Sequence, residues 1–399
     1  MSTEPKHYLD PENWILPSNK EAAEHYQNDW RGKEGNIKSL MQFRRHLSPL
    51  DVYCYLKDRF GSPNGMFNIL KSPTSDNLIH WDFLLKCEDV FICIMGKHRS
   101  LEILVNGNLN KEEWQTLVEN FRQGFSSHAK GKSEEKNKLE EWAVFINRYS
   151  ELCSEAEIHH DIISDLQNYQ YVSPVISDEV EKWQKKQEEV TDQFRKLQQA
   201  SLSLKMLTPI ILEAFINFLI LTTCKKEIRE HKPTYEARIK EKLHIKVPSL
   251  HLTCDYFAKA IDTNVEEYKH FKRIMDNRNW FFHGNADPRK DCLEKVYFER
   301  NTPIFKNGGD VFEHFFSALI EMIQPKKILD DYIHAHEFIL YVIECLDPKY
   351  KDEFWMMLKV STLGFNTKSE RFGILFPDYL VSSFLPGTPT DIGLFDKKE

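Results

Sequence analysis

The stretch RIMDNRNWFFHGNADP, residues Arg273–Pro288, decides how the C-terminal half of this chain is interpreted. It places a permanent cation, Arg278, an amide, Asn279, and a titratable imidazole, His283, within six residues. Apolar residues recur at helical spacing up to this run, which predicts the last turns of an amphipathic helix. Gly284 stands where the C′ residue of a helix belongs, and the proline that closes the stretch prevents the helix from resuming.

The spacing of these polar residues constrains how they can meet. Asn279 and His283 are four residues apart and therefore share a helix face. Arg278 is five residues from His283, about 140° round a regular helix. We therefore expect one of three arrangements: the Arg278 guanidinium extends around the helix toward His283, the last turn distorts, or a second chain completes the site. The alternative is a purely structural helix end, where a protonated His favours the dipole and Arg278 pairs with Asp276.

The run resembles the Arg-x4–6-His signature, with Asn after the Arg, of the HEPN superfamily (higher eukaryotes and prokaryotes nucleotide-binding domains). The resemblance covers about residues 203–348 and implies an antiparallel helical bundle. Many HEPN members are metal-independent ribonucleases that serve as toxins or in antiviral defence, with the site shared between two copies of the chain. The resemblance implies the same setting here.

Such a ribonuclease uses the 2′-hydroxyl of its substrate to attack the adjacent phosphorus. His283 can move protons near neutral pH, because imidazole titrates there, and Arg278 can clamp the phosphate with parallel hydrogen bonds. Asn279 can orient the phosphate or the imidazole. One Arg and one His are few groups for both acid and base, so a symmetric dimer that supplies two of each is expected.

Two further polar residues, Glu213 and Asn217, lie one turn apart on the apolar run Met206–Cys224. A carboxylate buried without a partner is costly, so we expect Glu213 to pair with Arg278 or Arg273. We predict supporting roles for Glu213, Asn217 and Asp276; the alternative is that Glu213 only holds an Arg or a backbone end in place. Because polar residues and a proline interrupt the run, a buried helix is favoured over a membrane span.

Two windows of the chain are basic although its formal net charge is −8. Residues 268–290 carry six Lys/Arg against two Asp, and residues 225–246 carry eight Lys/Arg against four Glu. Either window can be an RNA contact or only a solvated helix face. The residues predicted to contact RNA are Lys269, Lys272, Arg273, Arg289 and Lys290.

Neither a metal nor another cofactor is predicted. The eight cysteines are scattered without a CxxC pair, as buried reduced thiols are. His334 and His336 are about 200° apart on a helix, so they cannot both bind the same metal ion. His270 is interpreted as a solvated base. The polar N-terminal sequence has no signal peptide, so a cytoplasmic location without membrane attachment is expected.

A mainly α fold is expected, with a small α+β module over residues 1–128, a helical connector over 129–202, a HEPN-like antiparallel bundle over 203–350 and an extension over 351–399. In the module, apolar runs at 78–85, 90–95 and 101–105 predict an antiparallel meander. Residues 128–138 are predicted to be a polar linker. Beyond them, helices are predicted over 139–168, 177–205, 206–224, 249–261 and 264–283, with a short irregular insertion at 296–305.

The leading hypothesis is a cytoplasmic, dimeric endoribonuclease acting on single-stranded or looped RNA. Its N-terminal module would sense a trigger, bind a regulatory protein or restrain the nuclease. The first alternative is a non-catalytic HEPN module that binds nucleic acid or protein. The second is a scaffold whose charged helix at 177–205 drives assembly.

Overall fold

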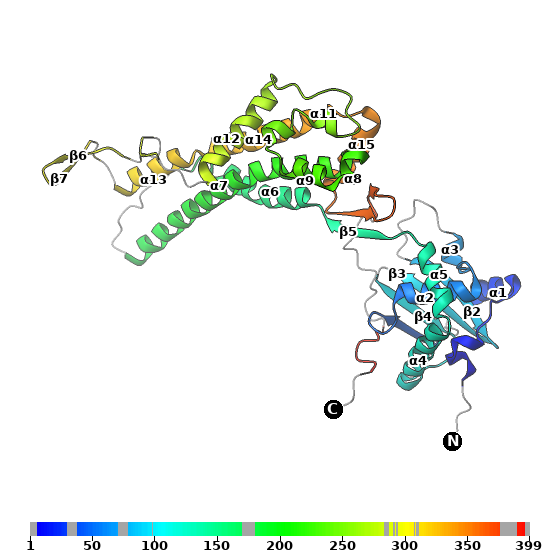
Figure 1. Ribbon diagram of the computed structural model, residues 1–399. Coiled ribbons are helices and arrows are strands. Elements are labelled where there is room, and N and C mark those ends of the chain that lie inside the picture. Colours follow the sequence, from blue (N-terminus) through cyan, green and yellow to red (C-terminus); the bar gives the residue numbers. More distant parts are fainter. Residues whose placement is uncertain are drawn as a thin grey trace. The chain divides into compact units, whose positions relative to one another are not determined.

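The computed structural model describes residues 6–29, 38–70, 79–97, 99–169, 180–282, 287–289, 292, 294–306, 308, 311–375 and 389–395. It is mainly helical, with several small antiparallel sheets that lie mostly in the N-terminal part (Figure 1). By its contacts the chain divides into two compact units. Unit 1 comprises residues 1–142, 366–369 and 376–399, and unit 2 comprises residues 143–365 and 370–375.

Unit 1 is built on a four-stranded antiparallel sheet with the order β1-β4-β3-β2. The predicted meander is confirmed, with a tight turn at Glu88, where φ is positive, between the first two of its strands. The edge strand β1, which pairs with β4, was not predicted. The strands are β1 (Ser39–Phe43), β2 (Ile79–Cys87), β3 (Val90–Lys97) and β4 (Ser100–Val105).

Helices cover both faces of this sheet because alternate side chains point to opposite sides. On β2, Phe83 packs with α2 and α4, whereas the next residue, Leu84, packs with α1 and α3 on the other face. The helices of unit 1 are η1 (His7–Leu9), η2 (Pro11–Asn13), α1 (Asn19–Asp29), α2 (Pro49–Phe60), α3 (Met66–Ile69), α4 (Lys111–Ser127) and α5 (Ala129–Lys138).

The prediction that residues 128–138 form a linker is wrong, because they form helix α5. This helix packs along α2, and two ion pairs join them, Lys132–Asp51 at 3.0 Å and Lys57–Glu135 at 3.1 Å. A polar composition was therefore mistaken for an unstructured segment.

The C-terminal segment 389–395 belongs to unit 1 and lies beside β1. Gln42 N–H donates to the Pro389 carbonyl at 2.8 Å, and Asp391 N–H donates to the Gln42 carbonyl at 3.0 Å. The Asp391 carboxylate is fully buried and accepts from the backbone N–H groups of Arg44, Arg45 and His46. Unit 1 is thus completed by residues from both ends of the sequence.

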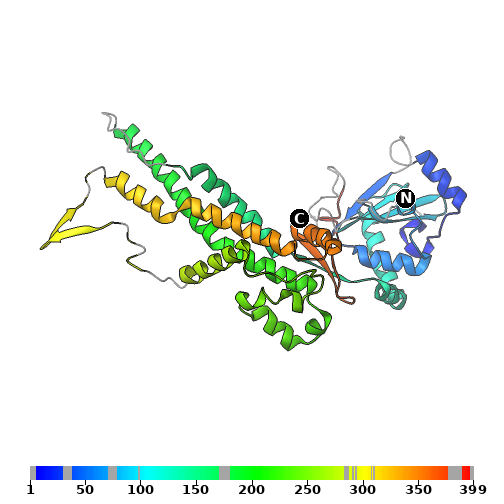
Figure 2. The same cartoon turned by 90° about the horizontal axis from the view of Figure 1, so that it is seen from above.

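Unit 2 is organised around one long helix, α7 (Val180–Thr223), which is the long green helix in Figures 1 and 2. The prediction of separate helices at 177–205 and 206–224 is wrong, because α7 continues through Pro209. Helix α6 (Arg148–Leu166) runs antiparallel to it: Tyr149 contacts Phe215 near one end, and Tyr169 donates to the Val190 carbonyl at the other.

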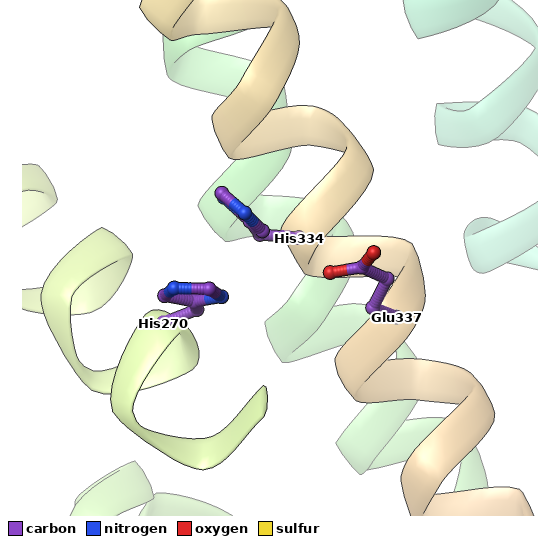
Figure 3. A group of neighbouring side chains, drawn as sticks. All are labelled: His270, His334 and Glu337. Carbon is purple, nitrogen blue, oxygen red and sulfur yellow. The ribbon is translucent and has the colours of Figure 1, made fainter. Parts of the chain in front are cut away.

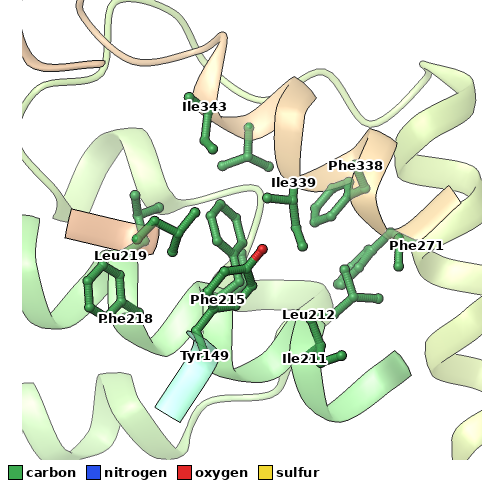
Figure 4. Close-up of a cluster of buried hydrophobic side chains, with 14 of the residues drawn as sticks. Tyr149, Ile211, Leu212, Phe215, Phe218, Leu219, Phe271, Phe338, Ile339 and Ile343 are labelled. Carbon is green, nitrogen blue, oxygen red and sulfur yellow. The ribbon is translucent and has the colours of Figure 1, made fainter. Parts of the chain in front are cut away.

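The core of unit 2 lies between α6, α7, α12 (Glu266–Phe282) and α14 (Pro325–Ile343). Figure 4 shows buried side chains from these four helices converging on Phe215, among them Phe271 and Phe338, whose rings stack at 4.3 Å. This packing fixes how α12, the helix that carries the signature run, lies on α7 and α14.

The remaining elements of unit 2 are shorter. A strand, β5 (Trp142–Ile146), precedes α6 where a continuous helix was predicted, and the expected irregular insertion is a β-hairpin. The helix predicted over 249–261 is a single turn. The elements are α8 (Lys226–Glu230), α9 (Lys232–Lys240), α10 (Leu243–Lys246), α11 (Leu250–Thr253), α13 (Val311–Ile323), α15 (Pro348–Lys359), β6 (Val296–Glu299), β7 (Thr302–Phe305), β8 (Thr362–Asn366) and β9 (Phe372–Gly373).

Helix α7 alone, among the described helices, is long and apolar enough to cross a membrane by length and composition. More than half of its apolar window is buried within the protein, as in the core helix of a soluble fold.

Candidate functional site

Helix α12 carries the signature run at its C-terminal end. Phe271, Ile274 and Met275 are buried at helical spacing and hold one face of α12 in the core. The helix is described to Phe282, and its predicted end at His283 lies outside the described residues. His283, Gly284 and Lys290 lie outside the described residues, and of Asn279 only the backbone, within α12, is described.

Arg278 pairs with Glu213 across the two helices. Its Nη2 atom lies 3.2 Å from Glu213 Oε2 on α7, and each side chain is about one-third exposed, at 32% and 37%. This confirms the expected pairing of Glu213 with Arg278. Arg273, the other expected partner, instead pairs with Asp331 of α14, where its Nη1 lies 2.6 Å from Oδ1.

A buried lysine that was not predicted completes this charged group. Lys246 is 1% exposed, and its Nζ donates to Asn217 Oδ1 at 3.1 Å and to the Ile239 carbonyl at 2.7 Å. Burial lowers the pKa of Lys246, while the negative charge of Glu213 opposes that shift. Asn217 therefore holds a buried cation one turn from Glu213, which gives it a structural role.

Two side chains of the basic window 225–246 are buried in the protein interior. Arg238, at 7% exposed, donates to the carbonyl of Lys246 at 2.6 Å and pairs with Glu241. Arg238 and Lys246 are therefore structural cations, and neither alternative given for this window, an RNA contact or a solvated helix face, describes these two residues.

The residues predicted to contact RNA differ in their surroundings. Lys272 and Arg289 are exposed, and Lys269 pairs with Glu266 of its own helix at 2.6 Å, in an exposed ion pair. Arg273 is held between α12 and α14 by its ion pair. Asp276, predicted as a supporting residue, is exposed on α12.

A second polar group spans α12 and α14, about two turns before Arg278 on α12. His270, His334 and Glu337 each offer a ligand atom, and these atoms lie within 4.8 Å of one another. Figure 3 shows His270 projecting from α12 toward His334 and Glu337 of α14. The spacing of His334 and His336 gave no sign of this group, because its members come from two helices.

The chain matches no protein-family model, no curated protein and no solved structure. Any functional assignment therefore depends on the residues and their geometry. An arginine held near the end of α12 by a carboxylate can bind a phosphate.

Proposed function

We propose that this chain is a metal-independent endoribonuclease of the HEPN type that cleaves single-stranded or looped RNA as a homodimer in the cytoplasm. The observation that carries the proposal is the Arg278–Glu213 ion pair between α12 and α7. It fixes the signature arginine at the end of a helix that is packed in the core of unit 2, and leaves its side chain about one-third exposed (32%) to solvent.

In the proposed reaction the 2′-hydroxyl oxygen forms a bond to phosphorus, and the bond from phosphorus to the 5′-oxygen breaks. The products are a 2′,3′-cyclic phosphate and a 5′-hydroxyl. Arg278 would neutralise charge on the non-bridging oxygens, and Asn279 would orient the phosphate or the imidazole. Two copies of His283, one from each chain of a dimer, would act as base and acid.

The setting proposed for this activity is a toxin or an antiviral-defence effector. Unit 1 would then be the regulatory part, which senses a trigger or binds a partner protein. Its surface has an open hollow of about 540 Å³ between β1, the start of α4 and the segment 389–394.

The same ion pair also favours a second candidate function. A guanidinium that joins α12 to α7 stabilises the fold whether or not it touches a substrate. In this alternative the chain is a non-catalytic helical module that binds RNA or protein.

The test is cleavage of total RNA in EDTA by the purified full chain, compared with Arg278→Ala and His283→Ala. RNA ends are mapped for 2′,3′-cyclic phosphates. Matched controls are Arg148→Ala, which removes an exposed arginine paired with Glu151, and His231→Ala, which removes an exposed histidine near Thr234. Circular dichroism and thermal unfolding verify that each variant is folded.

Cleavage by the wild type and both controls, lost in the two site variants, supports the proposal. Cleavage that survives both site substitutions overturns the site. If the wild type does not cleave RNA but binds labelled RNA, and Arg278→Ala weakens that binding, the second candidate is the correct one. Sedimentation at twice the 47.2 kDa chain mass is expected for the proposed dimer.

A further inference from the structure

The group formed by His270, His334 and Glu337 has the composition of a metal site. The two imidazole rings lie with their centroids 3.7 Å apart at 42°, and the Glu337 carboxylate lies beside them (Figure 3). Both histidines are half-buried and the glutamate is exposed, so a solvated ion can reach the group. Two imidazoles and one carboxylate are ligands that suit zinc and similar transition-metal ions.

The helix pair around this group is fixed on two sides. Phe271, next to His270, stacks on Phe338, next to Glu337, at 4.3 Å and 16°. One turn from His270 on α12, Arg273 pairs with Asp331 of α14 at 2.6 Å. The backbone positions of the three ligands are thus set by core packing and an ion pair, as a preorganised site requires.

The charge near the group permits a cation. Arg273 is a positive side chain beside the group, and its Nη2 lies 3.4 Å from His334 Nδ1, a long contact. Asp331 balances the charge of Arg273 at 2.6 Å, and Glu337 adds a negative charge. A metal that takes Nδ1 of His334 would replace the long contact and leave the Arg273–Asp331 pair intact.

We propose that His270, His334 and Glu337 bind one divalent transition-metal ion of the zinc class, which joins α12 to α14. With zinc-ligand bonds of about 2.0–2.2 Å in a tetrahedral arrangement, ligand atoms lie roughly 3.4 Å apart. The three ligand atoms here already lie within 4.8 Å, so side-chain rotation closes the site. Three protein ligands leave the fourth position for water or another small ligand.

This site is separate from the proposed nuclease and does not depend on it. None of its three ligands belongs to the signature run, and the reaction proposed above uses no metal. Magnesium and calcium prefer sites made of oxygen ligands, so a group with two imidazoles should discriminate against them.

The experiment is titration of the metal-free full chain with Zn²⁺ by calorimetry, and with Co²⁺ by visible absorption. One equivalent of Zn²⁺ is expected to bind and to raise the melting temperature, whereas Mg²⁺ at the same concentration is expected to do neither. Co²⁺ should give the intense visible bands of a tetrahedral site. His270→Ala and His334→Ala should each weaken Zn²⁺ binding by at least about 100-fold, more than loss of an outer ligand does.

The control is His160→Ala, which removes a histidine that lies beside one carboxylate, at 3.1 Å from Asp161, but outside the three-ligand group. It should bind Zn²⁺ as the wild type does. Glu337→Gln, a surface change that preserves side-chain size, keeps the test valid if a histidine variant does not fold. Binding that is absent in the wild type, or that survives substitution of all three ligands, overturns the proposal. The titration measures metal binding and not RNA cleavage. If the metal proposal fails, the result of the nuclease assay in EDTA is therefore unchanged.

Discussion

Ion pairs join α12 to its neighbouring helices, and the pair between Glu213 of α7 and Arg278 of α12 can be tested by substituting Glu213. Glu213 contacts Arg278 at 3.2 Å, but each side chain is about one-third exposed, so water screens their attraction. The pair is therefore expected to stabilise the fold modestly and to matter mainly through the position of the guanidinium.

For Glu213→Gln we predict a coupling with Arg278→Ala of about 0.5–1 kcal/mol in the free energy of unfolding, measured by a double-mutant cycle in urea. If the chain cleaves RNA as proposed, Glu213→Gln should lower kcat about 10- to 100-fold with a smaller change in KM, because the arginine is misplaced and not removed. Glu236→Gln, which removes a carboxylate in an exposed ion pair with Lys240, is the control. A coupling near zero would show that the two side chains act independently.

Lys246 gives a pH dependence whose sign can be worked out. Burial lowers its pKa in the folded chain below the usual 10.5. Between the two pKa values the unfolded chain binds more protons than the folded chain, so this residue makes stability rise with pH there. We therefore predict that the wild type gains stability relative to Lys246→Met as pH rises from neutral toward about 10.5, in urea unfolding at each pH.

The wild type and Lys246→Met share all other titratable groups, so the difference between their stabilities at each pH reports Lys246 alone. Lys240→Met, at an exposed lysine of α9, should show no such trend relative to the wild type. A parallel pH profile for the wild type and Lys246→Met would contradict the burial of a charged amine.

At the level of elements, one asparagine joins the start of α6 to the end of α15. Asn147 is 1% exposed, and its Oδ1 accepts from the N–H groups of Tyr149 and Ser150 at the first turn of α6. Its Nδ2 donates to three carbonyls at the C-terminus of α15, those of Met357, Leu358 and Val360, at 3.0–3.2 Å. The same side chain therefore caps two helix ends.

Asn147→Asp should destabilise unit 2 by about 2–4 kcal/mol at pH 7, because a carboxylate oxygen then faces three carbonyl oxygens where a donor is needed. The loss should diminish as pH falls toward about 5, since those carbonyls favour the protonated carboxyl. The control is Asp347→Asn at the start of α15, where either side chain accepts from Lys349 N–H, so less than about 0.5 kcal/mol is expected. Equal effects of the two substitutions in thermal unfolding would refute the shared cap.

Local patterns predicted some elements well and failed where tertiary contacts decide. The meander β2–β4 followed from three short apolar runs and the turn-length loops between them. Helix α5 did not, because Gly131 indicated a linker; in the fold a Cβ there would lie 2.0 Å from Asp58 Oδ1, so the glycine permits close packing of two helices. The boundary predicted between residues 205 and 206 likewise does not exist, because α7 continues through it and through Pro209 in packed surroundings.

The same distinction applies to the candidate site. An isolated carboxylate on an apolar helix predicts a cationic partner, and Glu213 has one. No comparable signal marks Lys246, whose partner Asn217 lies 29 residues away, or the group of His270 and His334, which come from different helices. Such groups form only when the helices pack, so spacing within one helix cannot reveal them.

At the scale of the whole molecule, the chain returns to unit 1 at its C-terminus, and Asp391 is what binds the returning segment. Burial alone would raise the pKa of this carboxyl, but N–H groups of Arg44, His46 and Arg45 donate to it and hold the pKa below the usual 3.8. His46 Nδ1 also lies 2.9 Å from Oδ2. A carboxylate with a depressed pKa stabilises the fold above pH 3.8, and that contribution is lost as pH falls through the folded value.

Asp391→Asn should release the segment 389–395 from β1, since an amide NH₂ group would face backbone donors at a fully buried position. We predict that the backbone amides of Gln42 and of the substituted residue exchange with deuterium at least about tenfold faster, which corresponds to about 1.4 kcal/mol of local stability. The wild type should show the same faster exchange only as pH falls through the folded pKa of Asp391, which lies below 3.8. Asp89→Asn, in the exposed turn between β2 and β3, is the charge-matched control. Unchanged exchange at Gln42 would show that the backbone pairing with Pro389 and the contacts of Leu394 in the core hold the segment without the carboxylate.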